Sequence, residues 1–400
     1  MKILTINTAP YGSVARIAIE TAELAEKNGI EDRLSFGYSY HPIISKYSYY
    51  HTGNLLSSVI DMGLSRITGL MGSFSYLYVF FFLNKIEQYD PDIIHLHNLH
   101  GCMNLRLITD YIKKRGIPVV WTFHDCWSFT GHCPHYEYVG CSKWKKECHH
   151  CPIYREFPES YIDNSRKMFQ KKKQWFSGFK RAVLVAPSFW MSEQLKQSFL
   201  SQYPIKVIQN GINLDVFKIE NSCFKQRLSI EDKFVLLGVS FGWGLKKGLD
   251  SFIRLSNVLG SEYQIVLVGT NYEIDKELPP SILSIHRTQN QKELAEIYNA
   301  ADLFVNLTRE DTFPTVNIEA LACGTPVITY KSGGSPEIID ETCGCVVEKD
   351  DFDNLVNKIK IIKEHKPYTS EACRKRAENF NKNDRFMDYI NLYKTITDEK

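Results

Sequence analysis

Short apolar segments alternate with longer amphipathic segments along this chain, and the alternation runs through it twice. The first series of short segments includes KILTI, DIIHLH, PVVWTFH and AVLVAPS, which have the length and composition of buried strands. The second includes FVLLGVS, QIVLVGT, DLFVNLT and TPVITY. Helical patterns such as ARIAIETAELAEKNG, which ends at a glycine, lie between them. Because strands that alternate with helices build parallel sheets covered on both faces, we expect an α/β chain with two Rossmann-like domains.

The second series begins after IQNGINLDVF, in which Asn210 and Gly211 favour a turn. We therefore expect an amino-terminal domain over residues 1–209, a second domain over 210–375, and a final helix over 376–400 that returns to the first domain. A division into two agrees with the length of 400 residues, since single cores stop growing near about 250–300 residues.

Charge and composition narrow the class of protein. A formal net charge of +2 gives no basic excess for binding nucleic acid. The start, MKILTINTAPYG, predicts a strand rather than a signal peptide, and with eleven cysteines this indicates a reducing, cytoplasmic location. Residues 67–84 carry no charge, but their serines, threonine and glycines favour a buried or membrane-surface helix over a spanning one.

The segment REDTFPTVNIEALACGTPVITYKSGGSPEII carries two carboxylates eight residues apart, Asp311 and Glu319. It follows a predicted strand, and ligands of parallel sheets bind where strands end. Thr315 and Val316 begin the next predicted helix, where backbone amides bind phosphate. Glu319, one turn further, can accept hydrogen bonds from a ribose diol, while Asp311 faces the group beyond the phosphate.

The same segment resembles the retaining GT-B glycosyltransferases of glycosyltransferase family 4, which have two Rossmann-like domains facing across a cleft. The family's E-A-x-A-C/S-G-T-P-V and G-G-x-x-E strings match from Glu319 and from Gly333-Gly334, two glycines that let backbone approach a bulky anion. The opening acid is Asp311 where the family usually has glutamate, and Glu310 beside it leaves both registers open. A helix whose polar residues only cap it is the structural alternative.

GVSFGWGLKKGLD resembles the family's G-R-L-x-x-x-K-G loop, whose Arg and Lys neutralise the donor diphosphate. This alignment gives Lys247 the role of the lysine and leaves Lys246 to replace the missing arginine; a solvated turn is the alternative. The resemblance also implies that Gly12, after the first strand, faces donor sugar or acceptor, although a glycine there is common in α/β folds. Residues near His286 are expected to meet the base.

WTFHDCW places His124 directly after a predicted strand, where the family has a histidine that touches the donor hexose. A hydrogen-bonded core histidine is the alternative. His95, His97 and His100, in HLHNLHG, end another predicted strand. They are equally compatible with the acceptor side of the site and with buried structural roles.

Residues 126–152 form a cysteine-rich insertion that resembles one in bacterial exopolysaccharide glycosyltransferases of the colanic acid type. Four thiols crowded into one loop suit a closed, structural zinc site, and four nearby histidines could each replace a cysteine. Reduced cysteines without metal are the alternative. The thiols are Cys133, Cys141, Cys148 and Cys151, and the histidines are His132, His135, His149 and His150.

SRKMFQKKKQWFSGF, just after the insertion, predicts a helix with apolar residues on one side and most of its basic residues elsewhere. This pattern fits an amphipathic helix on an anionic bilayer, at the inner face of the cell membrane. A core-packed helix with a solvated basic face fits equally well. The apolar side comprises Met168, Phe169, Trp175, Phe176 and Phe179.

The resemblance implies transfer of a hexose, with retention, from a nucleotide sugar to a glycan or lipid-linked oligosaccharide in bacterial surface polysaccharide synthesis. Lys247 and helix amides would meet the leaving diphosphate. We expect no catalytic metal, because the one Asp-x-Asp, Asp90-Pro-Asp92, precedes its strand. Two other classes remain open: a nucleotide-sugar epimerase of the same architecture, and a non-catalytic subunit that binds sugar nucleotide and docks to a membrane complex.

Overall fold

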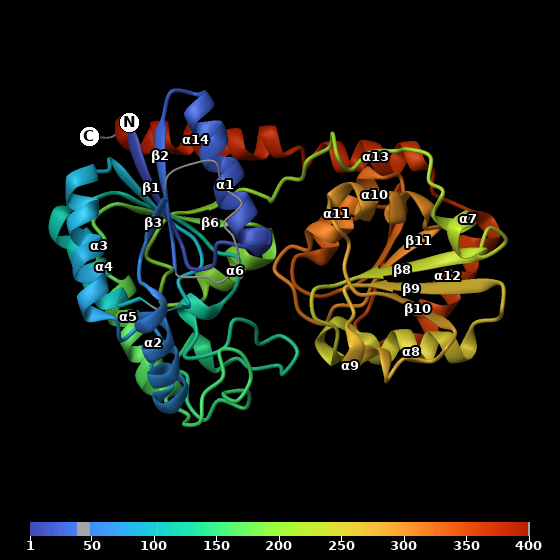
Figure 1. Ribbon diagram of the computed structural model, residues 1–400, viewed down its shortest axis with the longest axis horizontal. Coiled ribbons are helices and arrows are strands. Elements are labelled where there is room, and N and C mark those ends of the chain that lie inside the picture. The colour runs from blue at the N-terminus through green and yellow to red at the C-terminus, as the bar shows by residue number, and fades with distance from the viewer. Residues whose placement is uncertain (38–48, 102, 399–400) are drawn as a thin grey trace. The chain divides into compact units, whose positions relative to one another are not determined.

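The computed structural model describes residues 1–37, 49–101 and 103–398, and the chain divides into two compact units (Figure 1). The first unit comprises Met1–Gln209 with Arg385–Lys400, and the second comprises Asn210–Asp384. The second unit thus extends past the predicted limit of 375. The reason is that helix α13 (Ser370–Glu378) packs against α11 (Thr315–Ala322) of that unit.

The first unit is built on a seven-stranded sheet with the order β3-β2-β1-β4-β5-β6-β7, in which every pair of neighbours is parallel. This is a doubly wound, Rossmann-like order, with the strand order reversing beside β1. The strands are β1 Lys2–Asn7, β2 Glu31–Phe36, β3 Tyr49–His51, β4 Ile93–Leu96, β5 Val119–Thr122, β6 Ala182–Ala186 and β7 Ile205–Val207.

Helices cover both faces of this sheet (Figure 1). Helices α3, α4 and α5 pack on one face, while α14 packs on the other through Phe386, Tyr389 and Tyr393 against β1, β4, β5 and β6. The helices are α1 Gly12–Lys27, α2 Leu55–Thr68, α3 Tyr76–Tyr89, α4 Leu105–Arg115, α5 Ser165–Phe176, α6 Phe189–Lys196 and α14 Lys382–Asp398, with 3₁₀ turns at Trp127–Phe129 and Lys143–Lys145.

The apolar side of α5 is buried in the core of the first unit, so the structure agrees with the core-packed helix and not with the helix on a bilayer. Met168, Phe169, Trp175 and Phe176, with Phe179 just beyond the helix, are each at most 6% exposed and belong to the core that also contains α3 and α4. The uncharged stretch 67–84 is divided, since α2 ends at Thr68 and α3 begins at Tyr76. Among the described helices, none has the length and apolar character needed to cross a membrane.

The second unit has a six-stranded sheet with the order β10-β9-β8-β11-β12-β13, again parallel throughout. Helices α10, α11 and α13 contribute to one core, on one face, and α8 and α12 to another. The strands are β8 Phe234–Val239, β9 Tyr263–Val268, β10 Ile282–Ile285, β11 Leu303–Asn306, β12 Val327–Tyr330 and β13 Gly344–Val347. The remaining helices are α7 Phe224–Leu228, α8 Leu249–Val258, α9 Tyr272–Asp275, α10 Gln291–Ala300 and α12 Phe352–His365, with 3₁₀ turns at Leu245–Lys247 and Ser335–Ile338.

The two parallel sheets confirm the predicted α/β class with two Rossmann-like units. The chemistry-bearing segments follow the carboxyl ends of strands in both units, where a parallel sheet places its ligands.

Candidate active site

The acid segment forms the loop between β11 and α11. Helix α11 begins at Thr315, as predicted, and Pro314 is the residue before its first turn, with no side chain capping that end. The Ser332 hydroxyl, from the loop after β12, donates to the Thr308 carbonyl over 2.6 Å. The loops that follow β11 and β12 are therefore joined, and the start of α11, with Thr315 and Val316, lies beside them.

The two lysines of the turn after β8 pair with the two acids of this loop. Lys247 Nζ donates to Asp311 Oδ2 over 2.9 Å and to Thr308 Oγ1 over 3.3 Å. Lys246 Nζ lies 2.9 Å from Glu310 Oε1. The structure thus brings together residues that are more than sixty positions apart in the sequence.

The sequence leaves open whether Glu310 or Asp311 is the first acid of the motif, and the exposed fractions of the two side chains differ. The side chain of Glu310 is 5% exposed, whereas those of Asp311 and Lys247 are 25% and 31% exposed. Of two adjacent carboxylates, a dissolved ligand reaches the more exposed one more readily. This difference favours Asp311 over Glu310 as the acid that contacts a ligand.

Gly333 accommodates a close approach of backbone, but the group that approaches is part of the protein. A side-chain carbon placed on Gly333 would lie 1.6 Å from the carbonyl oxygen of Asp311, and its φ is +51°, in the left-handed region. The N–H of Gly334 donates to that same carbonyl over 3.2 Å. The paired glycines therefore hold the backbone of Asp311, and their contact with a bound anion stays a prediction.

Glu319 lies on the first turns of α11 and is largely buried. The Tyr298 hydroxyl, from α10, donates to Glu319 Oε2 over 3.2 Å. Burial and then the charge of Glu319 raise the pKa of Tyr298 well above its usual value, so the phenol keeps its proton and serves as the donor. This bond fixes the orientation of the Glu319 carboxylate.

Arg309 organises the loop and was not singled out in the sequence. Its guanidinium is almost buried, with Nη1 and Nη2 at 2.7 and 2.8 Å from the two oxygens of Asp250 and Nε at 2.6 Å from Asp350. Its backbone N–H also donates to the Lys246 carbonyl over 2.8 Å. The residue therefore ties the lysine turn to the acid loop. Its carboxylate partners lie far from it in sequence, and no local motif indicates them.

Arg309→Ala should lower the free energy of unfolding of the second unit by about 1–2 kcal/mol at neutral pH. This is less than for a fully buried pair, because Asp250 and Asp350 are 39% and 52% exposed. Burial raises the pKa of Asp250, but the hydrogen bonds and charge of Arg309 outweigh it and leave the pKa below 3.8. Because the folded-state pKa is depressed, this stabilisation should be present above about pH 4 and lost as the pH falls further.

Urea unfolding at pH 7 and pH 3 would measure both effects. Arg227→Ala, which removes an exposed pair with Glu296, is the matched control and should cost far less. Equal costs for the two variants would contradict the organising role of Arg309.

His286 lies at the end of β10, beside α9 of the second unit. Its Nε2 contacts Asp275 Oδ2, and its ring meets that of Tyr272 edge-on with centroids 4.5 Å apart. His286, which we predicted to contact the nucleotide base, is thus held in place by two neighbours at the carboxyl edge of the sheet.

In the first unit, Gly12 is the first residue of α1 and has φ +85°. A side-chain carbon placed on it would meet no atom within 4 Å.

His124 belongs to a row of buried histidines at the carboxyl ends of β4 and β5. His124 Nε2 lies 2.9 Å from His97 Nδ1, and the two rings are stacked with centroids 5.2 Å apart. His95 bonds Thr122 over 2.8 Å and the Tyr393 hydroxyl over 2.7 Å, which anchors α14. His95 therefore has a structural role, and His97 supports His124.

Burial keeps these three rings neutral. It lowers the pKa of His95 to about 3 and that of His124 to about 4, and it lowers the pKa of His97 well below 6.5. His124 can therefore donate or accept a hydrogen bond at neutral pH, but it carries no charge. His100 differs from them, because its Nε2 lies 2.8 Å from Asp125.

Acidification should destabilise the first unit from about pH 6.5 downward. The unfolded chain binds protons on these histidines near pH 6.5, whereas the folded chain stays neutral to about pH 4, so stability falls as the pH falls through this window. Each histidine removes up to about 1.4 kcal/mol per pH unit. Unfolding midpoints between pH 7.5 and 4.5 should show a shallower slope for His97→Gln than for the wild type.

The control for this slope is His365→Gln, since His365 is an exposed residue. An unchanged slope in His97→Gln, matching that of His365→Gln, would show that the buried ring does not resist protonation.

Of the four cysteines predicted to bind zinc, only two are hydrogen-bonded to each other. Cys133 and Cys151 are hydrogen-bonded to each other, which raises the pKa of Cys133 and lowers that of Cys151. The Gly131 N–H donates to Cys148 Sγ over 3.1 Å, and Cys141 is half-buried. Within the described ranges, however, no three His, Cys, Asp or Glu side chains converge in an arrangement that could hold a metal ion. Zinc binding by these four cysteines stays a prediction from the sequence.

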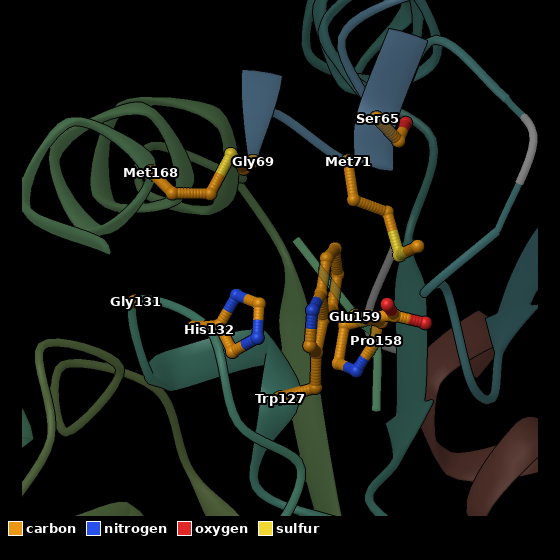
Figure 2. A pocket seen from close by; sticks show the side chains of 9 residues that line it. All are labelled: Ser65, Gly69, Met71, Trp127, Gly131, His132, Pro158, Glu159 and Met168. Carbon is orange, nitrogen blue, oxygen red and sulfur yellow. The ribbon is translucent and has the colours of Figure 1, made fainter. Parts of the chain in front are cut away.

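A small pocket adjoins this insertion (Figure 2). It lies between the end of α2, the loop 131–132 and α5, and Trp127, His132 and Met168 line it. Its volume of about 10 Å³ suffices for about one water molecule. It is too small for a sugar.

Comparisons with known proteins agree with this architecture. The model of the family described as Glycosyltransferase Family 4 matches residues 63–216, and that of Glycosyl transferases group 1 matches residues 224–384. The putative colanic acid biosynthesis glycosyl transferase WcaC of Escherichia coli K12 is 22% identical over 431 residues, covering 99% of this chain and 100% of the relative.

Two solved structures show the same fold over essentially their whole lengths. Sucrose-phosphate synthase from Thermosynechococcus elongatus is 17% identical with a TM-score of 0.73, and each chain is covered completely. Anabaena Alr3699/HepE in complex with UDP is 15% identical with a TM-score of 0.70, covering 99% of this chain and 100% of that one. The two family models together span most of this chain, which thus belongs to the GT-B glycosyltransferases of glycosyltransferase family 4.

Proposed function

We propose that this enzyme transfers a hexose from a nucleotide sugar to a saccharide acceptor in the synthesis of a bacterial surface polysaccharide, with retention of the anomeric configuration. The observation that carries this proposal is the pairing of Lys247 with Asp311 at the carboxyl ends of β8 and β11, beside the start of α11. A relative named for colanic acid biosynthesis spans the whole chain, and HepE has been solved with UDP-glucose as well as UDP. Both support the proposed substrate classes.

The leaving group is a nucleoside diphosphate in this proposal. Lys247 and Lys246 supply full positive charges, and the amides of Thr315 and Val316 add the partial positive charge of a helix start. These groups stabilise the charge that develops as the bond to the sugar breaks, and they act most strongly where water is excluded.

The remaining residues hold hydroxyl groups. Asp311 accepts from the donor sugar and Glu319 from the ribose, with its carboxylate fixed by Tyr298. His124 contributes a neutral ring from the first unit to position the hexose. The diphosphate oxygen takes the proton of the acceptor hydroxyl in a front-face displacement, so no dedicated protein nucleophile is needed.

Asp90 and Asp92 take no part in this chemistry. Asp92 Oδ2 accepts from the backbone N–H of Lys2, at the start of β1, and Asp90 pairs with Arg115. The Asp-x-Asp pair therefore lies at the amino-terminal edge of the sheet, away from the strand ends that bind ligands. This placement supports the expectation that the reaction needs no metal bound by that pair.

We further propose a cytoplasmic enzyme whose acceptor is lipid-linked.

Thermal stabilisation of the purified protein by UDP-, GDP- and ADP-hexoses tests the donor class. We expect one nucleotide series, UDP by analogy with HepE, to raise the unfolding midpoint, and the anomeric proton of the transferred sugar to show retention. Conversion of the sugar with no acceptor present would instead indicate an epimerase. Stabilisation without turnover on any lipid-linked or free saccharide would indicate a non-catalytic subunit.

A further inference from the structure

Helix α2 has its polar side facing the protein and its apolar side facing outward. The side chains that it buries are all polar: Ser57, Ser58, Asp61 and Ser65. Amphipathic helices of water-soluble proteins do the reverse and turn their apolar stripe to the core. The outward side of α2 carries seven large apolar residues that are 39–64% exposed, namely Leu55, Leu56, Val59, Ile60, Met62, Leu64 and Ile67.

Specific hydrogen bonds hold α2 in this orientation. Asp61 accepts from the Ser65 hydroxyl over 3.1 Å and from the hydroxyl of Ser75, at the start of α3. Asn54 and Ser57 form a capping box at the start of α2. Rotating α2 to bury its apolar stripe would break the bond from Ser75 to Asp61, whereas the bond from Ser65 and the capping box lie within α2 and would move with it. The outward placement of the apolar side chains is therefore a feature of the fold.

Helix α3, whose start is joined to α2 by the bonds from Ser75 to Asp61 and from Asn54 to Tyr78, also has exposed apolar side chains. Tyr76, Leu77, Phe80 and Phe81 are 53–63% exposed, while Val79, Phe82 and Ile86 pack into the core. We call the eleven outward apolar side chains of α2 and α3 the α2–α3 surface. Between Leu55 and Leu83 the sequence has only two charged residues: Asp61, which is buried, and Arg66, which pairs with Glu159. Exposed apolar side chains are thus far denser on these two helices than the scattered exposed residues of ordinary monomers.

A basic layer adjoins the α2–α3 surface. Helix α3 packs against α4, and α4 packs against α5, on one face of the sheet. The two adjoining helices themselves carry one acid, Asp110, against eight Lys and Arg residues that are exposed or half-exposed: Arg106, Lys113, Lys114, Arg115, Arg166, Lys167, Lys171 and Lys173. Acids outside α4 and α5 pair with Arg115 (Glu87 and Asp90) and with Arg166 (Glu147). An apolar surface bordered by cations matches the arrangement of a bilayer, whose acyl region lies next to anionic headgroups.

We propose that the α2–α3 surface docks on a bilayer that contains anionic lipids, with its apolar side chains among the acyl chains and the basic residues of α4 and α5 at the headgroups. Neither helix needs to span the membrane, since in-plane helices bury one side about 5–10 Å deep. This inference names a surface that the proposed transfer reaction does not require. It would hold the enzyme where lipid-linked acceptors are found.

Flotation of the full-length protein with vesicles tests this docking. We expect binding to vesicles of phosphatidylglycerol and phosphatidylcholine, weaker binding to phosphatidylcholine alone, and release by high salt. The double variant Ile60→Glu/Phe80→Glu should reduce vesicle binding at least about tenfold, because it places two charges on the side of the helices that would enter the acyl region of the bilayer. Val258→Glu changes an equally exposed apolar residue of α8 and should leave binding unchanged.

Two further measurements separate docking from the alternatives. Amide hydrogen exchange of the wild type should slow in α2 and α3 when anionic vesicles are added, which requires no variant. Thermal stabilisation by the donor nucleotide should be the same in the double variant, so a failed donor site and a failed docking surface are distinguishable. Unchanged flotation of the double variant would overturn the proposal. So would a dimer that forms in solution without lipid and dissociates in the double variant, because a second copy would then cover the surface.

Discussion

Lys247→Ala should lower kcat for sugar transfer by about 10²–10³-fold. In the proposed reaction its ammonium group meets charge that develops only as the diphosphate leaves, and removal of one such donor costs that much in well-studied enzymes. The 2.9 Å pair with Asp311 shows that the ammonium is already positioned at the strand ends. Initial rates at saturating donor and acceptor measure the effect, and an unchanged kcat would rule out this role.

A second measurement distinguishes contact with the diphosphate from mere support of Asp311. If Lys247 contacts phosphate, the variant should also lose thermal stabilisation by the nucleoside diphosphate alone, which has no sugar for Asp311 to hold. Lys218→Ala is the matched control, because Lys218 also lies 2.9 Å from a carboxylate oxygen, that of Glu220, in the same unit. It should retain full activity.

Gly333→Ala should reduce activity by about 10²-fold or more while the protein still folds. The carbon of the added methyl group would lie only 1.6 Å from the carbonyl oxygen of Asp311, so the loop that carries Asp311 must move. A displacement of about 1 Å in a positioning element can cost about 10²-fold in rate. The measurement is kcat/KM for the donor, alongside the unfolding midpoint.

Gly140→Ala provides a control with the same backbone strain. Gly140 has φ +61°, close to the +51° of Gly333, but a side-chain carbon there meets nothing within 4 Å. Both substitutions pay about 1–2 kcal/mol for a left-handed conformation, and only Gly333→Ala adds the clash. Equal activities in the two variants would show that the contact with Asp311 is unimportant.

The fold and the acid loop could be predicted because their signals are local. Apolar runs of strand length alternate with helical patterns in both units, and the string from Asp311 to Gly334 is contiguous in the sequence. Arg309 could not be assigned in the same way. Its role depends on Asp250, in α8, and Asp350, in the turn before α12, which meet it only in the folded chain.

Helices α2 and α5 show a second limit of pattern reasoning. Amphipathicity identifies which side of a helix is apolar, but not whether that side faces a core or a bilayer. The apolar side of α5, which includes Trp175 and Phe176, is buried, whereas the apolar side of α2 is exposed. Which side is buried depends on tertiary contacts, such as the bond from Ser75 to Asp61, that the pattern of one helix does not contain.

The first unit cannot finish folding during synthesis until helix α14, its last element, has been translated. The aromatic residues of α14 cover one face of the sheet formed by β1, β4, β5 and β6, yet the whole second unit is translated before this helix. At about 5–20 residues per second, roughly ten seconds or more pass between the end of the first sheet and the emergence of α14 from the ribosome. Throughout that interval the part of this face that α14 will cover, beside α1, stays exposed on the nascent amino-terminal half, and a chaperone can act on it.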